Sequence, residues 1–260
     1  MEKELVKTSV GDMWLFPNNM PAATGKGQDH WVTTICSGYF VSNRIRINDY
    51  ENAEIEYTKT YLKEGMTVVD VGANVGLYSV LAANKIGDTG RIFAFEPAPE
   101  IFEILKANAE LYPTITPYNF GLHNHKGEVY FKEKEVYEAA LRVEKGDDIL
   151  KDIDTVDFIK IDVDGAEVGV LEGMRDLIDR SPSVVIFIEY SPRHYDIAGF
   201  SSRRFFELVK ELGFEYGDLR PGNSGVQLKN GEHHIFEEMA VRWKRDLILW
   251  KGVEPFLPGM

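Results

Sequence analysis

One stretch of the chain constrains its fold more than any other. Residues 67–71 form a short apolar, β-branched run, which predicts a strand buried on both faces. Asp70 stands near the end of this run, and the glycines Gly72 and Gly76 lead the backbone into a helix that we expect to begin at Leu77. Glycine allows a tight turn that a ligand can approach closely, and the free N–H groups of the helix start point toward that ligand. The stretch therefore predicts the nucleotide-binding start of a doubly wound sheet.

Strand and helix patterns alternate along much of the remaining chain. We expect helices over residues 50–63, 77–86, 100–111, 166–179 and 201–212, and strands over residues 67–71, 91–95, 114–120, 157–161, 184–188, 214–219 and 246–250. A hairpin arm is expected at residues 127–131 and a turn at Asn230-Gly231. Strands separated by helices imply parallel pairing with right-handed crossovers, so the sequence predicts an α/β fold.

The first fifty residues show no clean periodicity. Residues 38–41 and 44–47 are compatible with short strands. Residues 17–28 are rich in Asn, Ala, Pro and Gly, which is typical of a loop. We interpret residues 1–50 as an N-terminal arm or lid, and expect it to face the substrate.

Composition narrows the classes of partner. The formal net charge of −13 repels a phosphate backbone, so we expect no nucleic-acid substrate. Cys36 is the single cysteine, which excludes an intrachain disulfide and fits a reducing compartment. The charged N-terminus does not resemble a signal peptide, and the apolar runs are too short to span a bilayer. We expect a soluble, cytoplasmic protein without a membrane partner; its oligomeric state is left open.

Acidic residues stand at the ends of four predicted parallel strands: Asp70, Glu96, Asp162 and Glu189. Ligands of such sheets bind beyond the carboxyl ends of the strands, so these acids are expected on one rim. An anionic dinucleotide would meet like charges in a partly desolvated cleft, whereas a cationic cofactor without phosphate would be attracted. S-adenosylmethionine, with its sulfonium and ammonium groups, fits this expectation.

Each acid also has a plainer interpretation, because a strand-terminal acid is commonly a helix cap or a loop anchor. Asp164 before Gly165 is typical of a turn and N-cap residue. Glu167 lies in the first helical turn, where the helix dipole favours acids.

The geometry of a doubly wound sheet predicts a role for each residue near the rim. The glycine turn would hold the methionine part of the cofactor, and Asp70 would attract its ammonium group. Glu96 would accept hydrogen bonds from the ribose hydroxyls, Gly121 would flank the adenine, and Asp162 would lie near the reactive methyl group. The predicted cofactor-binding set is Asp70, Gly72, Ala73, Asn74, Gly76, Glu96, Pro97, Gly121, Leu122 and Asp162.

Three blocks of sequence, residues 69–76, 95–97 and 158–167, together resemble the FkbM family of S-adenosylmethionine-dependent methyltransferases. The resemblance covers roughly residues 50 to 190. It implies a Rossmann-like class I fold: a mainly parallel seven-stranded sheet with the last strand antiparallel and helices on both faces. It also implies O-methylation of a hydroxyl group on a sugar or other small molecule, with residues 51–260 as the methyltransferase domain. Asp164 stands where many members carry Glu.

Methyl transfer to an alcohol requires that the acceptor oxygen lie in line with the methyl carbon and lose its proton. The candidate proton acceptors are Asp162, Glu189 and His194, although His194 also fits an ordinary surface histidine. His123 and His125 are weaker candidates, and His233-His234 is expected to be solvated.

A metal-assisted variant would use Asp162, Asp164 and Glu189 as oxygen ligands for Mg²⁺ or Ca²⁺. We expect no metal, and activity that survives EDTA would dismiss this variant.

Two other functions stay open on the sequence. An NAD-dependent oxidoreductase would use the same first strand and Glu96, but its turn reads Gly-x-Gly-x-x-Gly, and Asn74 occupies the middle position here. A non-catalytic protein that keeps the cofactor-binding fold is the second alternative.

Overall fold

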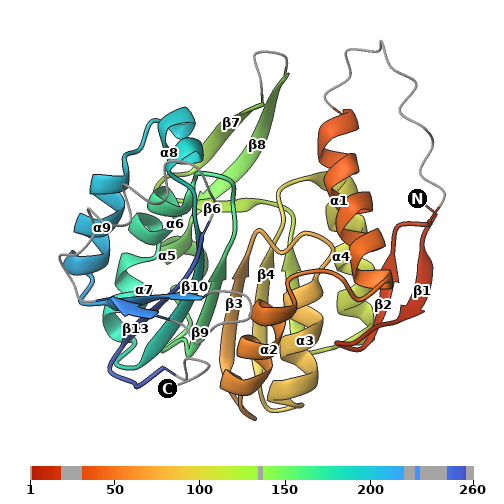
Figure 1. Cartoon of the computed structure of the whole chain (residues 1–260), viewed down its shortest axis with the longest axis horizontal. Coiled ribbons are helices and arrows are strands. Elements are labelled where there is room, and N and C mark those ends of the chain that lie inside the picture. The colour runs from red at the N-terminus through yellow and green to blue at the C-terminus, as the bar shows by residue number, and fades with distance from the viewer. Residues whose placement is uncertain (1, 19–30, 134–136, 220–225, 229–244, 256–260) are drawn as a thin grey trace.

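The computed structural model describes residues 2–18, 31–133, 137–219, 226–228 and 245–255. Its centre is one large sheet with helices on both faces, beside which lie a hairpin of two strands and a smaller sheet of three (Figure 1). The predicted turn at Asn230-Gly231 and the pair His233-His234 lie outside the described residues.

The large sheet has the strand order β12-β11-β13-β10-β9-β3-β4-β5. Its strands are β3 (Thr67–Val71), β4 (Arg91–Phe95), β5 (Ile115–Tyr118), β9 (Phe158–Ile161), β10 (Val184–Tyr190), β11 (Glu215–Leu219), β12 (Val226–Leu228) and β13 (Arg245–Lys251). β5, β4, β3, β9 and β10 pair in parallel, whereas β13 is antiparallel to both β10 and β11. The predicted seven-stranded sheet with an antiparallel last strand is confirmed, and the short β12 adds an edge strand that the sequence analysis missed.

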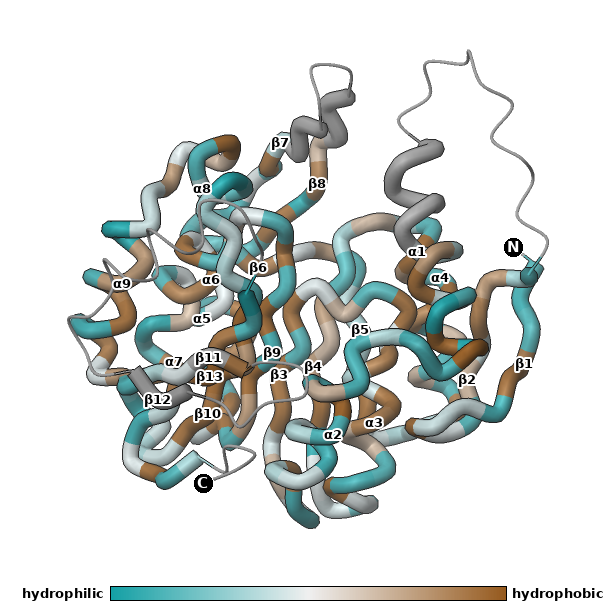
Figure 2. Tube along the Cα trace, viewed as in Figure 1, coloured by the Kyte–Doolittle hydropathy of each residue, from teal (hydrophilic) through white to brown (hydrophobic). Residues whose placement is uncertain are grey.

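The two faces of the sheet contribute to two hydrophobic cores. Because side chains alternate along a strand, Val68 packs into one core and Val69 into the other. All five residues of β3 are buried, as the sequence predicts. Figure 2 shows the apolar central strands between more polar helices. The described helices are α1 (Trp31–Arg46), α2 (Asn52–Tyr61), α3 (Leu77–Ile86), α4 (Pro99–Leu111), α5 (Gly146–Ile149), α6 (Glu167–Gly173), α7 (Arg175–Arg180), α8 (Pro192–Ala198) and α9 (Ser202–Glu211).

Helices α2, α3, α4 and α9 form where the sequence predicts them. At the start of α9, Ser201 accepts a hydrogen bond from the backbone N–H of Arg204 at 3.1 Å, as expected of an N-cap. The single helix expected over residues 166–179 is wrong, because the chain turns at Met174 and divides it into α6 and α7. Gly173, at the break, lies against the backbone of His123, and a Cβ there would overlap the His123 carbonyl. α8 was not predicted.

The N-terminal segment is part of the fold on the α3 and α4 side of the sheet. It forms a hairpin of β1 (Glu4–Lys7) and β2 (Asp12–Leu15), followed by α1. The strands expected over residues 38–41 and 44–47 are wrong, because Val41, Ser42 and Ile45 are buried at helical spacing within α1. The Asn108 side chain accepts from the Trp14 N–H at 2.6 Å and donates to its carbonyl at 2.9 Å, which joins β2 to α4.

The smaller sheet has the order β6-β8-β7, with β6 (Gly121–His123), β7 (Gly127–Glu133) and β8 (Tyr137–Lys145). β7 and β8 form the expected hairpin arm. The strand predicted over residues 114–120 ends earlier, at Tyr118, because the chain then leaves the large sheet and pairs β6 with β8.

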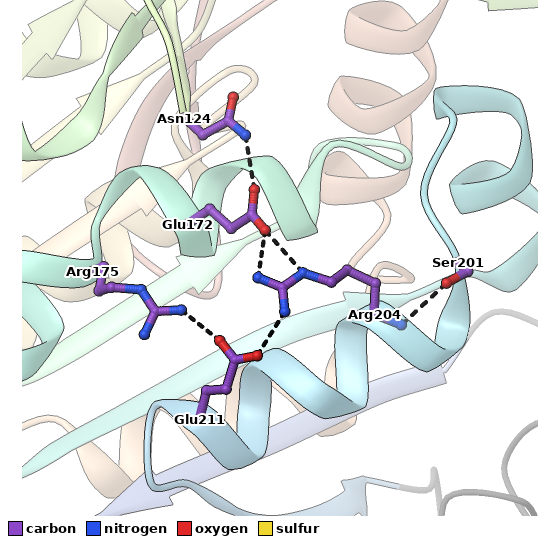
Figure 3. A network of polar contacts seen from close by, with 6 residues as sticks. All are labelled: Asn124, Glu172, Arg175, Ser201, Arg204 and Glu211. Carbon is purple, nitrogen blue, oxygen red and sulfur yellow. Dashed lines mark hydrogen bonds and ion pairs between the residues drawn. The ribbon is translucent and has the colours of Figure 1, made fainter.

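A surface network of ion pairs joins α6, α7 and α9 (Figure 3). Arg204 binds Glu172 at 2.7 Å and Glu211 at 2.8 Å, and Arg175 binds Glu211 at 2.7 Å. Asn124, just after β6, donates to Glu172 at 2.8 Å. These charges hold three helices together on the face opposite to α2 and α3. Among the described residues, no helix is both long and apolar enough to traverse a lipid bilayer.

Candidate functional site

The predicted convergence of acids is present at the carboxyl rim of the sheet. β3 lies between β4 and β9, so Asp70 stands between the strands that lead to Glu96 and to Asp162. Burial is the main cause of the raised pKa of both Glu96 and Asp70; Asp70 also raises the pKa of Glu96, and Asp162 that of Asp70, as expected of carboxylates that share one region. Glu189 lies inside β10 rather than after it, and pairs in register with Asp246 of β13.

Glu96 is held by the backbone of the turn that follows β3. Its carboxylate accepts hydrogen bonds from the N–H of Asn74 at 3.0 Å and of Ala98 at 2.8 Å. Burial nevertheless raises its pKa to about 7, although both hydrogen bonds oppose this shift. Each carboxylate oxygen has a second lone pair, so Glu96 keeps the capacity to accept from a diol.

Asp70 is only 1% exposed, and one of its carboxylate oxygens accepts a hydrogen bond. Its Oδ2 accepts from the Ser79 hydroxyl at 2.6 Å, whereas its buried Oδ1 has no hydrogen-bond partner among the described residues. Burial raises the pKa of Asp70, while Lys160 and Ser79 oppose that shift. A buried acceptor without a donor is costly, and a cationic or N–H donor would satisfy it.

The glycine turn after β3 serves the protein's own packing. A Cβ on Gly72 would overlap the carbonyl of Asp162, and one on Gly76 would lie 2.9 Å from Leu105. Asn74 has a positive φ of 50°, which asparagine tolerates better than most residues, and its Oδ1 accepts from Val75 N–H at 2.9 Å. Protein atoms therefore fill the side of each glycine on which a Cβ would stand, so packing as well as the turn requires glycine at both positions.

The residues expected beside the adenine lie in a strand rather than a loop. Gly121 and Leu122 are buried in β6. Gly121 packs near Pro97, whose ring would lie 3.7 Å from a Cβ on Gly121. Asn119 donates to the carbonyl of Glu96 at 3.0 Å and fixes the turn between them. The segment thus lies next to Glu96, but β-pairing fixes its backbone.

Asp162, immediately after β9, forms an ion pair with Lys160. The distance from Nζ to Oδ2 is 3.1 Å, and the ammonium lies 4.5 Å from the centroid of the Tyr78 ring. Burial alone would lower the pKa of Lys160, but Asp162, Glu51 and Asp70 raise it, so the side chain stays charged. Sequence analysis missed Lys160, although a lysine in an otherwise apolar strand is the signal of such a buried pair.

The loop between β9 and α6 is held by Glu167, not by Asp164. Asp164 adopts a positive φ of 50° and does not cap α6, so its predicted N-cap role is wrong. Instead, Glu167 is fully buried, and its Oε1 accepts from the N–H groups of Val163 and Gly165 at 3.3 and 3.2 Å. The longer Glu167 side chain reaches back to these donors. Burial raises its pKa to about 8.

His194 lies in α8 at the same rim, where its Nδ1 is 3.5 Å from a carboxylate oxygen of Asp164. Among the described residues, ligand atoms of Asp164, Glu189 and His194 lie within 4.8 Å of one another. The metal-assisted variant named Asp162 in place of His194, but the carboxylate of Asp162 lies beside Lys160. His123 and His125 contact each other near β6, with 3.0 Å between their Nδ1 atoms.

Three further titratable residues at the rim were not predicted. Tyr50 and Glu51 precede α2, and Asp246 stands just before the buried part of β13. Glu51 and Asp162 both act on the pKa of Tyr50, and both raise the pKa of Asp246, which burial brings to about 8. Residue spacing gives no signal for this grouping, because it joins elements that are distant in the chain.

The residues present fit S-adenosylmethionine. The orphaned Asp70 oxygen suits a cationic donor, and Glu96 suits a ribose diol. The strand order, the glycine turn after β3 and the acid after β4 define a Rossmann-like protein of the class I methyltransferase type. The chain belongs to the FkbM methyltransferase family: the family model "Methyltransferase FkbM domain" matches residues 70–216. The cofactor of this class is S-adenosylmethionine.

Named relatives agree with the family. Hexuronic acid methyltransferase AglP of Haloferax volcanii is 27% identical over 159 residues, which are 56% of this chain and 65% of that protein. Ribosomal RNA large subunit methyltransferase E of Alkalilimnicola ehrlichii is 34% identical over 71 residues, or 27% of this chain and 32% of that protein. The chain spans less than two thirds of the length of these relatives.

Among solved structures, methyltransferase FkbM from Methylobacillus flagellatus is 18% identical, with a TM-score of 0.47 over 85% of this chain and 55% of that chain.

Because a ribosomal RNA methyltransferase is among the relatives, the exclusion of a nucleic-acid substrate stays a prediction from net charge.

Proposed function

We propose that this protein transfers a methyl group from S-adenosylmethionine to a hydroxyl group of a sugar or another small molecule. The observation that supports it best is the rim at which Asp70, Glu96 and Asp162 meet, since these acids attract a cationic cofactor and repel an anionic dinucleotide. The likeness to a hexuronic acid methyltransferase favours a sugar acceptor.

The bound cofactor would supply an activated methyl group on a sulfonium. The chain's own residues bind and orient: Glu96 would accept from the ribose hydroxyls, and Asp70 would take the ammonium, directly or through water. The turn made of Gly72, Ala73, Asn74 and Gly76 would support the methionine part, and Pro97, Gly121 and Leu122 would border the adenine. Asp162, Glu189 and His194 are proposed to face the acceptor.

The N-terminal segment is proposed to cover the acceptor, with residues 51–260 forming the catalytic domain. β1, β2 and α1 pack on α4 and lead to Tyr50 at the rim. Only the last residues of the segment would then contact the substrate.

Two measurements test this function. Thermal shift with S-adenosylmethionine, S-adenosylhomocysteine and NAD should show stabilisation by the first two; stabilisation by NAD alone would reverse the assignment in favour of an oxidoreductase. A radiolabelled-methyl screen should then find transfer to glucuronic acid or a neutral glycoside, and none to ribosomal RNA. Cofactor binding without transfer to any acceptor would favour the non-catalytic alternative.

A further inference from the structure

The segment that enters α2 has an unusual backbone. Asn48 and Glu51 adopt left-handed conformations, with φ of 52° and 46°. Such conformations cost roughly 1 kcal/mol or more in residues other than glycine, and they persist where surrounding contacts impose them. The Glu51 side chain makes no capping bond to α2, although the Glu51 carbonyl accepts from Ile55 N–H at 2.8 Å. The helix therefore uses the backbone of Glu51 and leaves its carboxylate for another purpose.

That carboxylate is held by a tyrosine of α3. The Tyr78 hydroxyl donates to Glu51 Oε2 at 2.7 Å, and Tyr50 is the neighbour of Glu51 in the chain. Tyr78 is 7% exposed and Lys160 5%, whereas Tyr50 and Glu51 are only half-buried. Glu51 thus lies at the upper edge of a buried polar cluster, where a molecule entering the rim can reach it.

Charged groups face Glu51 from every element around it. Burial raises the pKa of Glu51, and Asp162 after β9 adds to this shift. Lys160 of β9 opposes it, as do Tyr78 and Tyr50. Glu51 in turn raises the pKa of Asp246 in β13, to which Glu54 of α2 also contributes. One lysine thus stands among several acids in the described part of this cluster, which favours proton uptake by a carboxylate.

We propose that Glu51 and Tyr50 form the subsite for the acceptor hydroxyl, and that Glu51 takes up its proton during methyl transfer. As the acceptor oxygen bonds to the methyl carbon, the carbon–sulfur bond breaks and its electron pair stays on sulfur, which leaves a neutral thioether. The acceptor O–H bond breaks and the proton passes to the Glu51 carboxylate. This role rests on the proposed function and specifies which residue of the site performs the proton transfer.

Glu51 suits this role better than Asp162 does. The Asp162 carboxylate forms an ion pair with Lys160 at 3.1 Å, and such a partner lowers the basicity of a carboxylate. The Glu51 carboxylate accepts from the neutral Tyr78 hydroxyl, which can orient it without cancelling its charge, while the ion pair of Lys160 is with Asp162. Tyr50, the half-buried neighbour of Glu51 in the chain, is proposed to orient the acceptor.

The test compares Glu51→Gln with Glu56→Gln, a matched change on the exposed face of α2 where Glu56 pairs with Lys59. The probe acceptors are methyl α-D-glucopyranoside and the corresponding glucuronide, with tritiated S-adenosylmethionine. We expect Glu51→Gln to lower kcat about 100-fold or more, with the affinity for S-adenosylhomocysteine unchanged. The wild-type kcat should fall at low pH, and this acid limb should vanish in Glu51→Gln but not in Glu56→Gln.

A second variant separates chemistry from folding. Tyr78→Phe removes one hydrogen bond that lowers the pKa of Glu51, so the acid limb should move to higher pH. A Glu51→Gln enzyme that keeps its kcat and acid limb would overturn the inference. Wild-type enzyme that fails to bind the cofactor, or that binds it and methylates neither probe, would refute the proposed function and the subsite with it.

Discussion

Two groups of acids in this protein are arranged in opposite ways. On the outer face, Glu172 and Glu211 each bind an arginine at 2.7 Å in the network of Figure 3. At the sheet rim, Asp70, Glu96 and Asp246 are largely desolvated and have few cations nearby. Bonds to arginine lower the pKa of Glu211, whereas burial raises the pKa of each rim acid.

This contrast distinguishes acids that connect helices through ion pairs from acids that we propose bind a ligand. Paired surface carboxylates contribute little to stability and need nothing further. Buried carboxylates without full compensation cost stability, and a protein retains them where a bound group offsets that cost. The rim is therefore where loss of a charge should have large effects, and the outer face is where it should have small ones.

The largest effect is expected from Lys160→Met. Lys160 is the buried cation beside Asp162, and loss of one partner of a buried ion pair costs about 3–5 kcal/mol. Urea unfolding monitored by circular dichroism measures this, with the exposed Lys151→Met as control. A loss below about 1 kcal/mol would show that the rim acids do not depend on this lysine.

The next effect is that the free energy of unfolding of the ligand-free protein should depend on pH. Glu96 has a folded pKa of about 7, and Glu167 and Asp246 of about 8, all above their unfolded values. Between about pH 5 and 8 the unfolded chain has released protons that the folded chain retains, so stability should fall as pH rises. The linkage relation gives on the order of 3 kcal/mol for each of these three groups over this range.

Thermal melts from pH 5 to 8 test this dependence. Asp246→Asn should flatten the slope because it removes one of the titrating groups, and the exposed Glu103→Gln should not. Glu211 of the surface network adds no slope in this window, because its lowered pKa keeps it ionised until the pH falls below its usual range. A melting temperature that rises with pH would contradict the burial of these groups in protonated form.

The third effect concerns the cofactor. Glu96→Ala should weaken S-adenosylhomocysteine binding roughly 100-fold, since hydrogen bonds to a charged acceptor contribute about 1.5–3 kcal/mol each. Isothermal titration calorimetry measures the affinity for S-adenosylhomocysteine, with the exposed Glu103→Ala of α4 as control. The N–H groups of Asn74 and Ala98 lose their acceptor, so we also expect about 2 kcal/mol of destabilisation. Unchanged affinity would remove Glu96 from the cofactor site.

Local pattern predicted the central sheet well. Local sequence is enough to determine the structure of the run at residues 67–71, the glycines after it and the apolar strands that follow. β3, α3 and β4 form at the predicted residues. In α1 the aromatic and β-branched residues suggested strands, whereas burial of Val41 and Ile45 against the rest of the fold favours a helix. Tertiary packing overrode local preference there.

The site divides in the same way. Asp70, Glu96 and Asp162 follow from strand ends, so the sequence predicts their meeting. Glu51 reaches the rim from the position before α2 and Asp246 from an antiparallel strand, so only the folded chain brings them near Lys160. Glu167 was assigned to the helix dipole, because its hydrogen bonds to Val163 and Gly165 depend on the path of the loop.

The smallest effect is expected on the outer face, and it completes the contrast. Arg204→Ala removes the cation shared by Glu172 and Glu211, yet all three side chains are partly exposed, at 33%, 23% and 45%. Solvent screens such pairs, so we expect a loss of about 0.5–1 kcal/mol and no change in cofactor affinity. Because the pairing is electrostatic, 1 M salt should abolish the difference from wild type. A loss above about 2 kcal/mol that persists in salt would mean that this network acts as a buried one, and the distinction between the two groups of acids would fail.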